Sequence, residues 1–221
     1  MICNQNYCAI ITAGGSSQRF GNSNKLLEKI HSKEVIRYTV EAFLSVEEIQ
    51  EIIICANVSI LEDLKNIFSN SKIRIIKGGN TRQESVFNGL KACINCDYVL
   101  IHDGARPMIS PEIIKNAMQK VTQKHALTVA TKTIDTIKQV DNDLKIIKTI
   151  DRSSLYNTQT PQAFEYALIK DAHLKLKGQD FSDDAGMLEH LGREVYVLEG
   201  DYKNIKITTQ NDLEFAKIYL K

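Results

Sequence analysis

The sequence predicts an α/β fold with a Rossmann-like, mostly parallel sheet, helices on both faces and a projecting β-hairpin arm. Short apolar runs alternate along the chain with stretches whose apolar residues recur at helical spacing. Strands separated by helices form right-handed crossovers, which build a parallel sheet covered on both sides. A later stretch with a different, two-residue periodicity predicts the arm.

The first half of the chain supplies most of the predicted strands and helices. The strands are apolar runs, as expected for strands buried on both faces, and they cover residues 8–12, 51–56, 72–77 and 98–102. The helices between them are indicated by apolar residues three or four positions apart. These are Ile36, Val40 and Phe43, then Val86 and Leu90, then Ile113, Ala117 and Val121.

The pattern changes after a further predicted strand at residues 127–130. Residues 133–140 and 144–150 alternate in polarity around Asp-Asn-Asp, which indicates a hairpin. A ribbon with one apolar face finds little to pack against on a sheet already covered by helices. We therefore expect an arm at about residues 133–150 that reaches a second subunit in a homodimer. The alternative is an edge hairpin folded on its own domain.

The C-terminal part of the chain is expected to close the same core. Ser182 is the predicted N-cap of a helix that runs to about Leu191, residues 195–199 form a late strand, and Thr209 starts the last helix. The apolar face of that helix consists of Leu213, Ala216 and Leu220. With 221 residues and no linker or repeat, the chain is expected to form a single domain over residues 1–221.

The composition of the chain argues against nucleic acid and membrane as partners. The chain has 28 Lys and Arg against 27 Asp and Glu, so it lacks the positive field of a general nucleic-acid binder, and no nucleic-acid partner is expected. The sequence has no bilayer-spanning apolar run and no signal-peptide pattern at its start, which predicts a cytoplasmic protein without a membrane partner. The five cysteines follow no disulfide framework, and we interpret the isolated CxxC of Cys93 and Cys96 as incidental thiols.

The first segment that could form part of a functional site is residues 12–21, Thr-Ala-Gly-Gly-Ser-Ser-Gln-Arg-Phe-Gly, which follows a predicted buried strand. Its small side chains let backbone N–H groups approach an anion, although its spacing is neither a Walker loop nor a dinucleotide fingerprint. Arg19 and Lys25 add two cations, which can neutralise charge that develops in phosphoryl transfer. The alternatives are a structural turn with solvated surface charges.

A second glycine-rich segment, residues 78–85, lies between a predicted strand and a helix. Thr81 is the expected N-cap, with Glu84 as its capping-box partner. The two glycines before this cap indicate close approach of a ligand, and a base or sugar is more plausible here than another phosphate. The alternative is that this segment only caps the helix and binds no ligand.

A third segment, His-Asp-Gly-Ala-Arg-Pro at residues 102–107, follows a strand at the edge where open α/β sheets bind ligands. Asp103 is the best candidate for a Mg²⁺ ligand, because one carboxylate with phosphate oxygens and waters commonly holds this ion. The alternative for Asp103 is a surface turn, and His102 is interpreted as a strand residue. Three later polar segments, residues 151–152, 158–162 and 204–208, form either a pocket for an acidic substrate or plain surface.

Six segments occur in a set order along the chain: AGGSSQRFG at 13–21, GGNTRQES at 78–85, HDGARP at 102–107, DRSSL at 151–155, QTPQAF at 159–164 and NIKIT at 204–208. In this order they resemble the 2-C-methyl-D-erythritol 4-phosphate cytidylyltransferases of the non-mevalonate isoprenoid pathway. The resemblance implies a homodimeric enzyme with a projecting arm. It also implies Mg²⁺-dependent transfer of CMP from CTP to methylerythritol phosphate, with release of pyrophosphate.

The resemblance assigns roles that spacing cannot. Arg19 and Lys25 match residues that bind the triphosphate and stabilise the transition state, and Asp103 matches the Mg²⁺ ligand. The catalytic set is completed by Arg152 and Lys206, which would orient the acceptor. The nucleotide would be surrounded by Ala13, Gly14, Gly15, Gly79, Arg82 and Ser85. The acceptor site matches Arg106, Thr136, Arg152, Thr160 and Lys206, and the arm shares this site across the dimer.

Three positions depart from the usual family pattern. Thr12 stands before Ala-Gly-Gly where Pro-Ala-Ala-Gly or Leu-Ala-Ala-Gly is usual, Asn24 replaces the proline before the lysine, and Asn80 replaces a common aspartate. Two other functions remain compatible with the sequence. One is a cytidylyltransferase for another polyol phosphate, such as ribitol 5-phosphate, and the other is a non-catalytic nucleotide-binding subunit.

Overall fold

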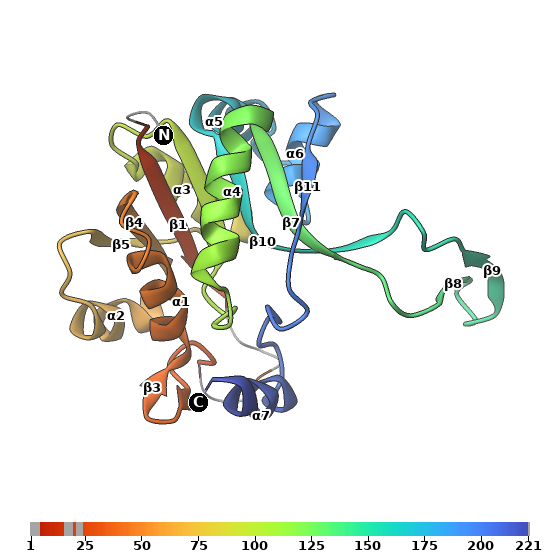
Figure 1. The fold of residues 1–221 in the computed structure, drawn as a ribbon, viewed down its shortest axis with the longest axis horizontal. Helices are drawn as coiled ribbons and strands as arrows, with labels where there is room; N and C mark the ends of the chain where they lie inside the picture. The colour runs from red at the N-terminus through yellow and green to blue at the C-terminus, as the bar shows by residue number, and fades with distance from the viewer. Residues whose placement is uncertain (1–4, 16–19, 21–23, 221) are drawn as a thin grey trace.

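A seven-stranded sheet in the order β11-β7-β10-β6-β1-β4-β5 runs through the molecule (Figure 1). The structure is a computed structural model that describes residues 5–15, 20 and 24–220. The strands are β1 Tyr7–Ala13, β4 Ile49–Ala56, β5 Ile73–Lys77, β6 Tyr98–Asp103, β7 Ala126–Lys132, β10 Tyr156–Glu165 and β11 Tyr196–Glu199. Strand β10 is antiparallel to both neighbours, whereas the other pairs are parallel. The predicted mostly parallel sheet is confirmed.

Helices cover both faces of this sheet, as the sequence predicts. One face carries α1 Val35–Leu44, α2 Leu61–Ile67 and α4 Pro111–Lys124, and the other carries α3 Arg82–Ala92, α5 Tyr166–Lys175 and α6 Asp184–His190. Strand β1 shows the division directly. Its Ala9 and Ile11 pack with α1 and α4, whereas the intervening Ile10 packs with α3, α5 and α6. Successive residues of the strand thus pack into opposite layers of the core.

The hairpin arm is formed by β8 Ile137–Val140 and β9 Ile146–Ile150, which pair with each other in a separate two-stranded sheet. Figure 1 shows it extending far from the body on the two long connections that leave β7 and return to β10. Its side chains Leu144, Ile146 and Ile147 are 80%, 58% and 57% exposed. The arm therefore projects as predicted, and the alternative of a hairpin folded on its own domain is wrong.

The last helix, α7 Gln210–Tyr219, closes a smaller core beside the short hairpin of β2 Lys29–Ile30 and β3 Lys33–Glu34. Leu213 and Ala216 are buried there against Ile30 and Ile207, with Leu220 at the edge, which confirms the predicted apolar face. Within the described part of the chain, no helix has both the length and the apolarity needed to cross a bilayer.

Strand β10 and helices α2 and α5 were not predicted from the sequence. Strand β10 contains Gln159, Thr160 and Gln162, which are buried and satisfied by hydrogen bonds to other side chains or backbone groups, so it shows no apolar run.

The prediction that Ser182 is the N-cap of α6 is wrong. Asp183 caps this helix, because its Oδ1 accepts a hydrogen bond from Gly186 N at 2.9 Å.

Helix α7 begins with a complete capping box, in which Thr209 Oγ1 accepts from Asp212 N and Asp212 Oδ2 accepts from Thr209 N. We expect Thr209→Ala to lower the free energy of unfolding by about 1 kcal/mol and the melting temperature by about 2–4 °C. Both are measured by thermal and urea denaturation. Glu214→Ala, on the exposed face of the same helix, is the control and is expected to change stability by less than about 0.5 kcal/mol. Equal effects of the two substitutions would contradict the role of the cap.

Candidate active site

A cavity of about 860 Å³ opens at the carboxyl ends of β1, β4, β5 and β6, where Thr12, Ala56, Lys77 and Asp103 stand on its wall. This is the edge at which open α/β sheets bind their ligands. The sequence-predicted residues that line it are Gly14, Gly15, Lys25, Gly79, Arg82, Ser85, Asp103 and Lys206. Five separate chain segments therefore converge on one space.

The two glycine-rich segments meet at Ser85, the buried first-turn residue of α3. Its hydroxyl donates to Thr81 O at 2.9 Å and accepts from Gly79 N at 3.0 Å. A Cβ atom on Gly14, or one on Gly78, would lie only 2.9 Å from the same oxygen. Glycine is required at both positions because two backbone segments approach one side chain. Ser85 thus fixes the spacing between the two loops.

Gly15 differs from these glycines because an added Cβ would meet no described atom within 4 Å. The room above its backbone belongs to the cavity, which suits a ligand lying against the chain.

Glu84 forms only half of the predicted capping box. Its backbone N–H donates to Thr81 Oγ1, but its carboxylate accepts from Asn80 N at 2.7 Å instead of from the cap itself. The hydrogen bond from Asn80 N to Glu84 fixes the loop before α3, which lines the cavity.

Asn57 supports the first glycine segment and was missed in the sequence analysis. It follows β4 directly, and its Nδ2 donates to Gly14 O at 3.2 Å while its backbone N–H donates to Ala13 O at 3.0 Å. Ala13, which was expected beside the nucleotide, is buried at the end of β1 and is not among the residues that line the cavity. Lys77 was also missed, although the signal was the same for both: a polar residue at the carboxyl end of a predicted strand.

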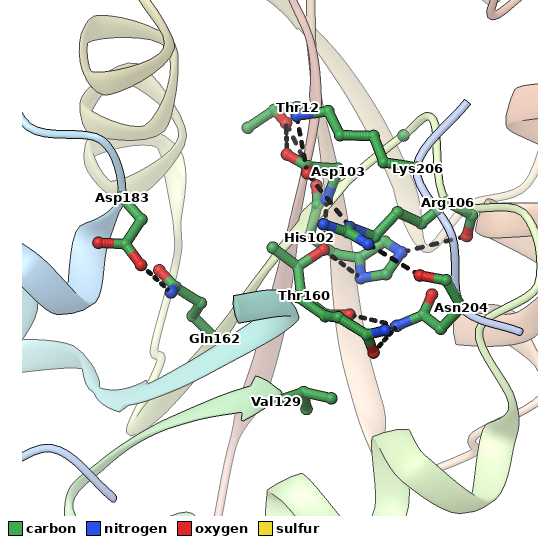
Figure 2. A network of polar contacts seen from close by, with 12 residues as sticks. Thr12, His102, Asp103, Arg106, Val129, Thr160, Gln162, Asp183, Asn204 and Lys206 are labelled. Atoms are coloured by element: carbon green, nitrogen blue, oxygen red, sulfur yellow. Dashed lines mark hydrogen bonds and ion pairs between the residues drawn. The ribbon is translucent and has the colours of Figure 1, made fainter. Parts of the chain in front are cut away.

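Asp103 is surrounded by three cations, of which Figure 2 shows Lys206 and Arg106. Its Oδ2 is 3.0 Å from Lys206 Nζ and 3.4 Å from Arg106 Nε, and its Oδ1 is 3.7 Å from Arg82 Nε. Burial alone would raise the pKa of Asp103, but Lys206, Arg82 and Arg106 outweigh it and hold that pKa far below the ordinary range. The carboxylate is therefore ionised at neutral pH.

Arg82 is held in place from behind by Asp184, the first residue of α6. Its Nη1 is 2.7 Å from Asp184 Oδ2, and the other carboxylate oxygen is 3.0 Å from His173 Nε2. Asp184 is 1% exposed. Burial tends to raise its pKa, but Arg82 and His173 lower it below the ordinary value. Asp184 was missed in the sequence analysis, yet it positions a cation of the cavity.

Arg106 and Thr160, expected at the acceptor, lie beneath Asp103 and are not among the residues that line the cavity. Arg106 Nη1 donates to Asn204 O at 2.8 Å, and Thr160 Oγ1 accepts from Asp103 N at 3.1 Å. Thr160 is also 3.0 Å from His102 Nδ1. In this position both side chains hold the Asp103 segment from below.

His102 is a strand residue, as predicted. It is fully buried, and burial lowers its pKa to about 3, so the ring is neutral. With the Thr160 hydroxyl donating to Nδ1, the proton on Nε2 points to the Arg106 carbonyl 3.4 Å away. A neutral ring with both nitrogens occupied has no proton to exchange with a ligand.

Lys206 reaches the cavity because the segment after β11 is attached to the end of β6. Ile207 N donates to Ala105 O at 2.8 Å, and the Ile207 side chain is buried. Lys206 and Asp103 are 103 positions apart in the sequence, and these anchors bring them together. The remaining predicted cation of the first loop, Arg19, lies outside the described residues.

Thr136 and Arg152, the other predicted acceptor residues, lie on the arm and are exposed. Arg152 Nη1 donates to Ile134 O within the arm. Neither residue lines the cavity of its own chain, and Figure 1 shows the arm directed away from the body. These two residues can meet a ligand in the cavity only if the arm serves another subunit.

Comparisons with known proteins agree with this arrangement. The sequence model of the 2-C-methyl-D-erythritol 4-phosphate cytidylyltransferase family matches residues 7–221. A relative with this name from Caldanaerobacter subterraneus is 41% identical, over 98% of this chain and 99% of its own. Another from Geobacillus thermodenitrificans is 40% identical, over 97% of each chain.

Solved structures give the same result. The 4-diphosphocytidyl-2C-methyl-D-erythritol synthase of Anaerococcus prevotii superposes with a TM-score of 0.88 at 35% identity, covering 98% of this chain and 96% of its own. The 2-C-methyl-D-erythritol 4-phosphate cytidylyltransferase of Francisella tularensis has a TM-score of 0.83 at 28% identity, with 97% and 99% covered. The chain belongs to the 2-C-methyl-D-erythritol 4-phosphate cytidylyltransferase family.

Proposed function

We propose that this chain transfers CMP from CTP to 2-C-methyl-D-erythritol 4-phosphate in the cytoplasm. The products are 4-diphosphocytidyl-2-C-methyl-D-erythritol and pyrophosphate, and the reaction belongs to the non-mevalonate isoprenoid pathway. The observation that carries the proposal is one cavity in which two glycine-rich segments face Lys25, Arg82 and Lys206 around a single ionised carboxylate. The names of the relatives supply the identity of the two substrates.

The charge of the cavity suits a triphosphate. Its described lining contains four cationic side chains, Lys25, Lys77, Arg82 and Lys206, against one carboxylate, Asp103. The backbone at Gly15 leaves room for phosphate oxygens, and the loop before α3, which lines the same cavity, would face the base and sugar. In phosphoryl transfer, positioning and electrostatic stabilisation supply most of the rate enhancement, and this cavity offers both.

The proposed reaction is an in-line displacement at the α-phosphorus of CTP. An oxygen of the acceptor phosphate forms the new bond to phosphorus, the bond to the bridging oxygen breaks, and pyrophosphate leaves with the electron pair. The acceptor phosphate is already an anion at neutral pH, so no general base is needed, and the neutral, enclosed His102 is unsuited to that role. The main obstacle is repulsion between two anions. Lys25, Lys206 and the arm's Arg152 would offset it and hold the reacting atoms in line.

The residues around Asp103 fit Mg²⁺ bound together with nucleotide. Asp103 is the one carboxylate among the described lining residues, and a single carboxylate normally holds this ion only with phosphate oxygens and waters. The same carboxylate is 3.0 Å from Lys206 Nζ, so Lys206 would turn toward the acceptor phosphate when the ion is bound. When bound, Mg²⁺ would stabilise negative charge on the α-phosphoryl group and the departing pyrophosphate.

The arm supports a homodimer in which each chain completes the acceptor site of the other. Its apolar side chains Leu144, Ile146 and Ile147 are exposed in the single chain, and an exposed apolar ribbon of this kind usually marks a protein interface. Thr136 and Arg152 are on the same arm and do not line the cavity of their own chain. Docking the arm on a partner would bury the apolar residues and place these two polar ones at the partner's cavity.

Acceptor identity is tested by CTP-dependent release of pyrophosphate with two acceptors in parallel. We expect rapid release with 2-C-methyl-D-erythritol 4-phosphate and a value of kcat/KM at least about 100-fold lower with ribitol 5-phosphate, because unmatched polar groups in a buried site cost several kcal/mol. The order of reactivity is the measured result. Release with ribitol 5-phosphate alone would replace the proposed acceptor with the alternative polyol phosphate.

Lys25→Ala tests whether the chain is an enzyme or a silent nucleotide-binding subunit. We expect kcat to fall by about 100- to 1000-fold, because a charge placed at the transition state contributes more there than in the ground state. The affinity for CTP, measured by calorimetry, is expected to fall much less. Lys29→Ala, four positions on and exposed, is the matched control and should retain wild-type kinetics. Unchanged turnover in Lys25→Ala would favour the non-catalytic alternative.

Arg152→Ala tests the role of the arm. We expect kcat/KM for the acceptor to fall by about 30-fold or more, because a charge-assisted contact to phosphate is lost, with little change in the KM for CTP. Lys148→Ala, also exposed on the arm, is the control. An unchanged kcat/KM for the acceptor would remove Arg152 from the acceptor site.

Hybrid dimers then show which chain the arm serves. A heterodimer of one Lys25→Ala chain and one Arg152→Ala chain is isolated by tandem affinity tags. If the arm serves the partner, both defects fall in one site and the other site is intact, so about half of the wild-type activity returns. If each arm served its own chain, both sites would carry one defect and activity would remain at the level of the parent variants.

A further inference from the structure

A group of three cysteines lies at the end of the sheet away from the nucleotide cavity. The sulfur atoms of Cys8, Cys93 and Cys96 are all within 4.8 Å of one another. Cys8 is the second residue of β1, Cys93 directly follows α3, and Cys96 precedes β6 by two positions. The sequence favoured incidental thiols because the CxxC stood alone. The fold adds a third cysteine that is 85 positions away from Cys93 in the chain.

Backbone contacts hold the three cysteines in place. Cys93 N donates to Gly89 O at 3.1 Å and closes α3, and the turn continues through Asn95, whose φ of 50° lies in the left-handed region. The end of this turn is attached to the start of β1, because Asp97 N donates to Asn6 O at 2.9 Å. The CxxC turn and Cys8 are therefore parts of one hydrogen-bonded unit rather than a chance encounter of mobile side chains.

A carboxylate lies beside the group, next to Cys8. Glu51 Oε2 is 4.0 Å from Cys8 Sγ and accepts from Ile94 N at 3.4 Å, within the CxxC turn itself. The other oxygen, Oε1, is 2.7 Å from Arg74 Nη2, so an ion pair holds the carboxylate beside Cys8. Glu51 is on β4, the neighbour of β1 in the sheet. Carboxylate oxygen is among the ligands that zinc accepts beside cysteine thiolates, and Arg74 is the residue that would orient it.

We propose that Cys8, Cys93 and Cys96, with Glu51 as fourth ligand, bind one Zn²⁺ ion in a structural site. Zinc takes four ligands at tetrahedral angles, and two thiolates about 2.3 Å from the same ion lie roughly 3.8 Å apart. Sulfur atoms already within 4.8 Å of one another need only small side-chain rotations to reach that arrangement. The thiol protons are released to solvent on binding, and no oxidant takes part.

A structural zinc site can be distinguished from two alternatives, a Cys93–Cys96 disulfide and a catalytic metal site. A Cys93–Cys96 disulfide would use two sulfur atoms and leave no role for Cys8 or for the carboxylate that faces it. With four protein ligands, the proposed ion has no open position for a substrate, which is the property of a structural zinc site. The ion would join β1, β4 and the turn between α3 and β6, and so would stabilise the fold rather than take part in catalysis.

The test uses the full-length protein, reduced and stripped of metal under anaerobic conditions, and titrated with Zn²⁺ against a chromophoric chelator. We expect one Zn²⁺ per chain bound with submicromolar affinity, and a rise in melting temperature of about 5–10 °C at saturating zinc. Co²⁺ added in place of Zn²⁺ should give the intense thiolate-to-metal charge-transfer absorption of a tetrahedral cysteine site.

Cys93→Ser and Cys96→Ser, which are half-buried positions, are each expected to weaken Zn²⁺ binding by about 100-fold, and Glu51→Gln by about 10-fold. Cys55→Ala is the matched control, since Cys55 is a buried cysteine of the same sheet outside the group. It should bind Zn²⁺ as the wild type does. Melting curves without metal confirm that each variant is folded. Failure of the reduced protein to bind Zn²⁺, or full affinity in both serine variants, would overturn the proposal.

Discussion

The site is organised around one buried carboxylate. Asp103 ends the central strand β6 with its side chain 8% exposed, and a charge removed from water to this extent is tolerated only when cations are close to it. The three that surround it come from separate places: Arg82 from α3, Arg106 from the turn after β6, and Lys206 from the segment after β11. Each of these segments must fold correctly for the charge to be neutralised. The pairing of Asp103 thus couples formation of the cavity to formation of the sheet.

The cations are themselves fixed by polar residues that do not reach the cavity. Asp184 holds Arg82, and the α6 backbone at Asp184 is in turn held by Gln162 Oε1, which accepts from Asp184 N at 3.0 Å. Gln162 Nε2 also donates to Asp183 Oδ2 at 2.7 Å (Figure 2). On the other side of the strand, Thr160 supports the Asp103 backbone. The antiparallel strand β10 therefore serves as a polar support, and this explains why a central strand contains so few apolar residues.

The sequence predicted those parts of the fold whose cause is local. Strands β1, β4 and β6 are apolar because both of their faces are buried, and Asp103 was identified because a polar residue at the carboxyl end of such a strand has few structural reasons to be there. Strand β10 was missed because its polar side chains are satisfied by partners far away in the sequence. Lys206 and the arm residues Thr136 and Arg152 could be assigned only by resemblance to a family. For the same reason, nothing in the sequence connects Cys8 with Cys93, since only the pairing of β1 with its neighbours brings them together.

The excess of cations among the described lining residues favours an order in which the two substrates bind. The described lining contains Lys25, Lys77, Arg82 and Lys206 but only one carboxylate, Asp103, and a triphosphate would bring negative charge to this cationic wall. Lys206 is the cation whose partner would change, because its amino group is close to Asp103 and its side chain is 40% exposed. If the carboxylate takes up Mg²⁺ with the nucleotide, Lys206 becomes available for the acceptor phosphate. Nucleotide binding would then prepare the acceptor site, so that the second anion enters only after the charge of the first has been compensated.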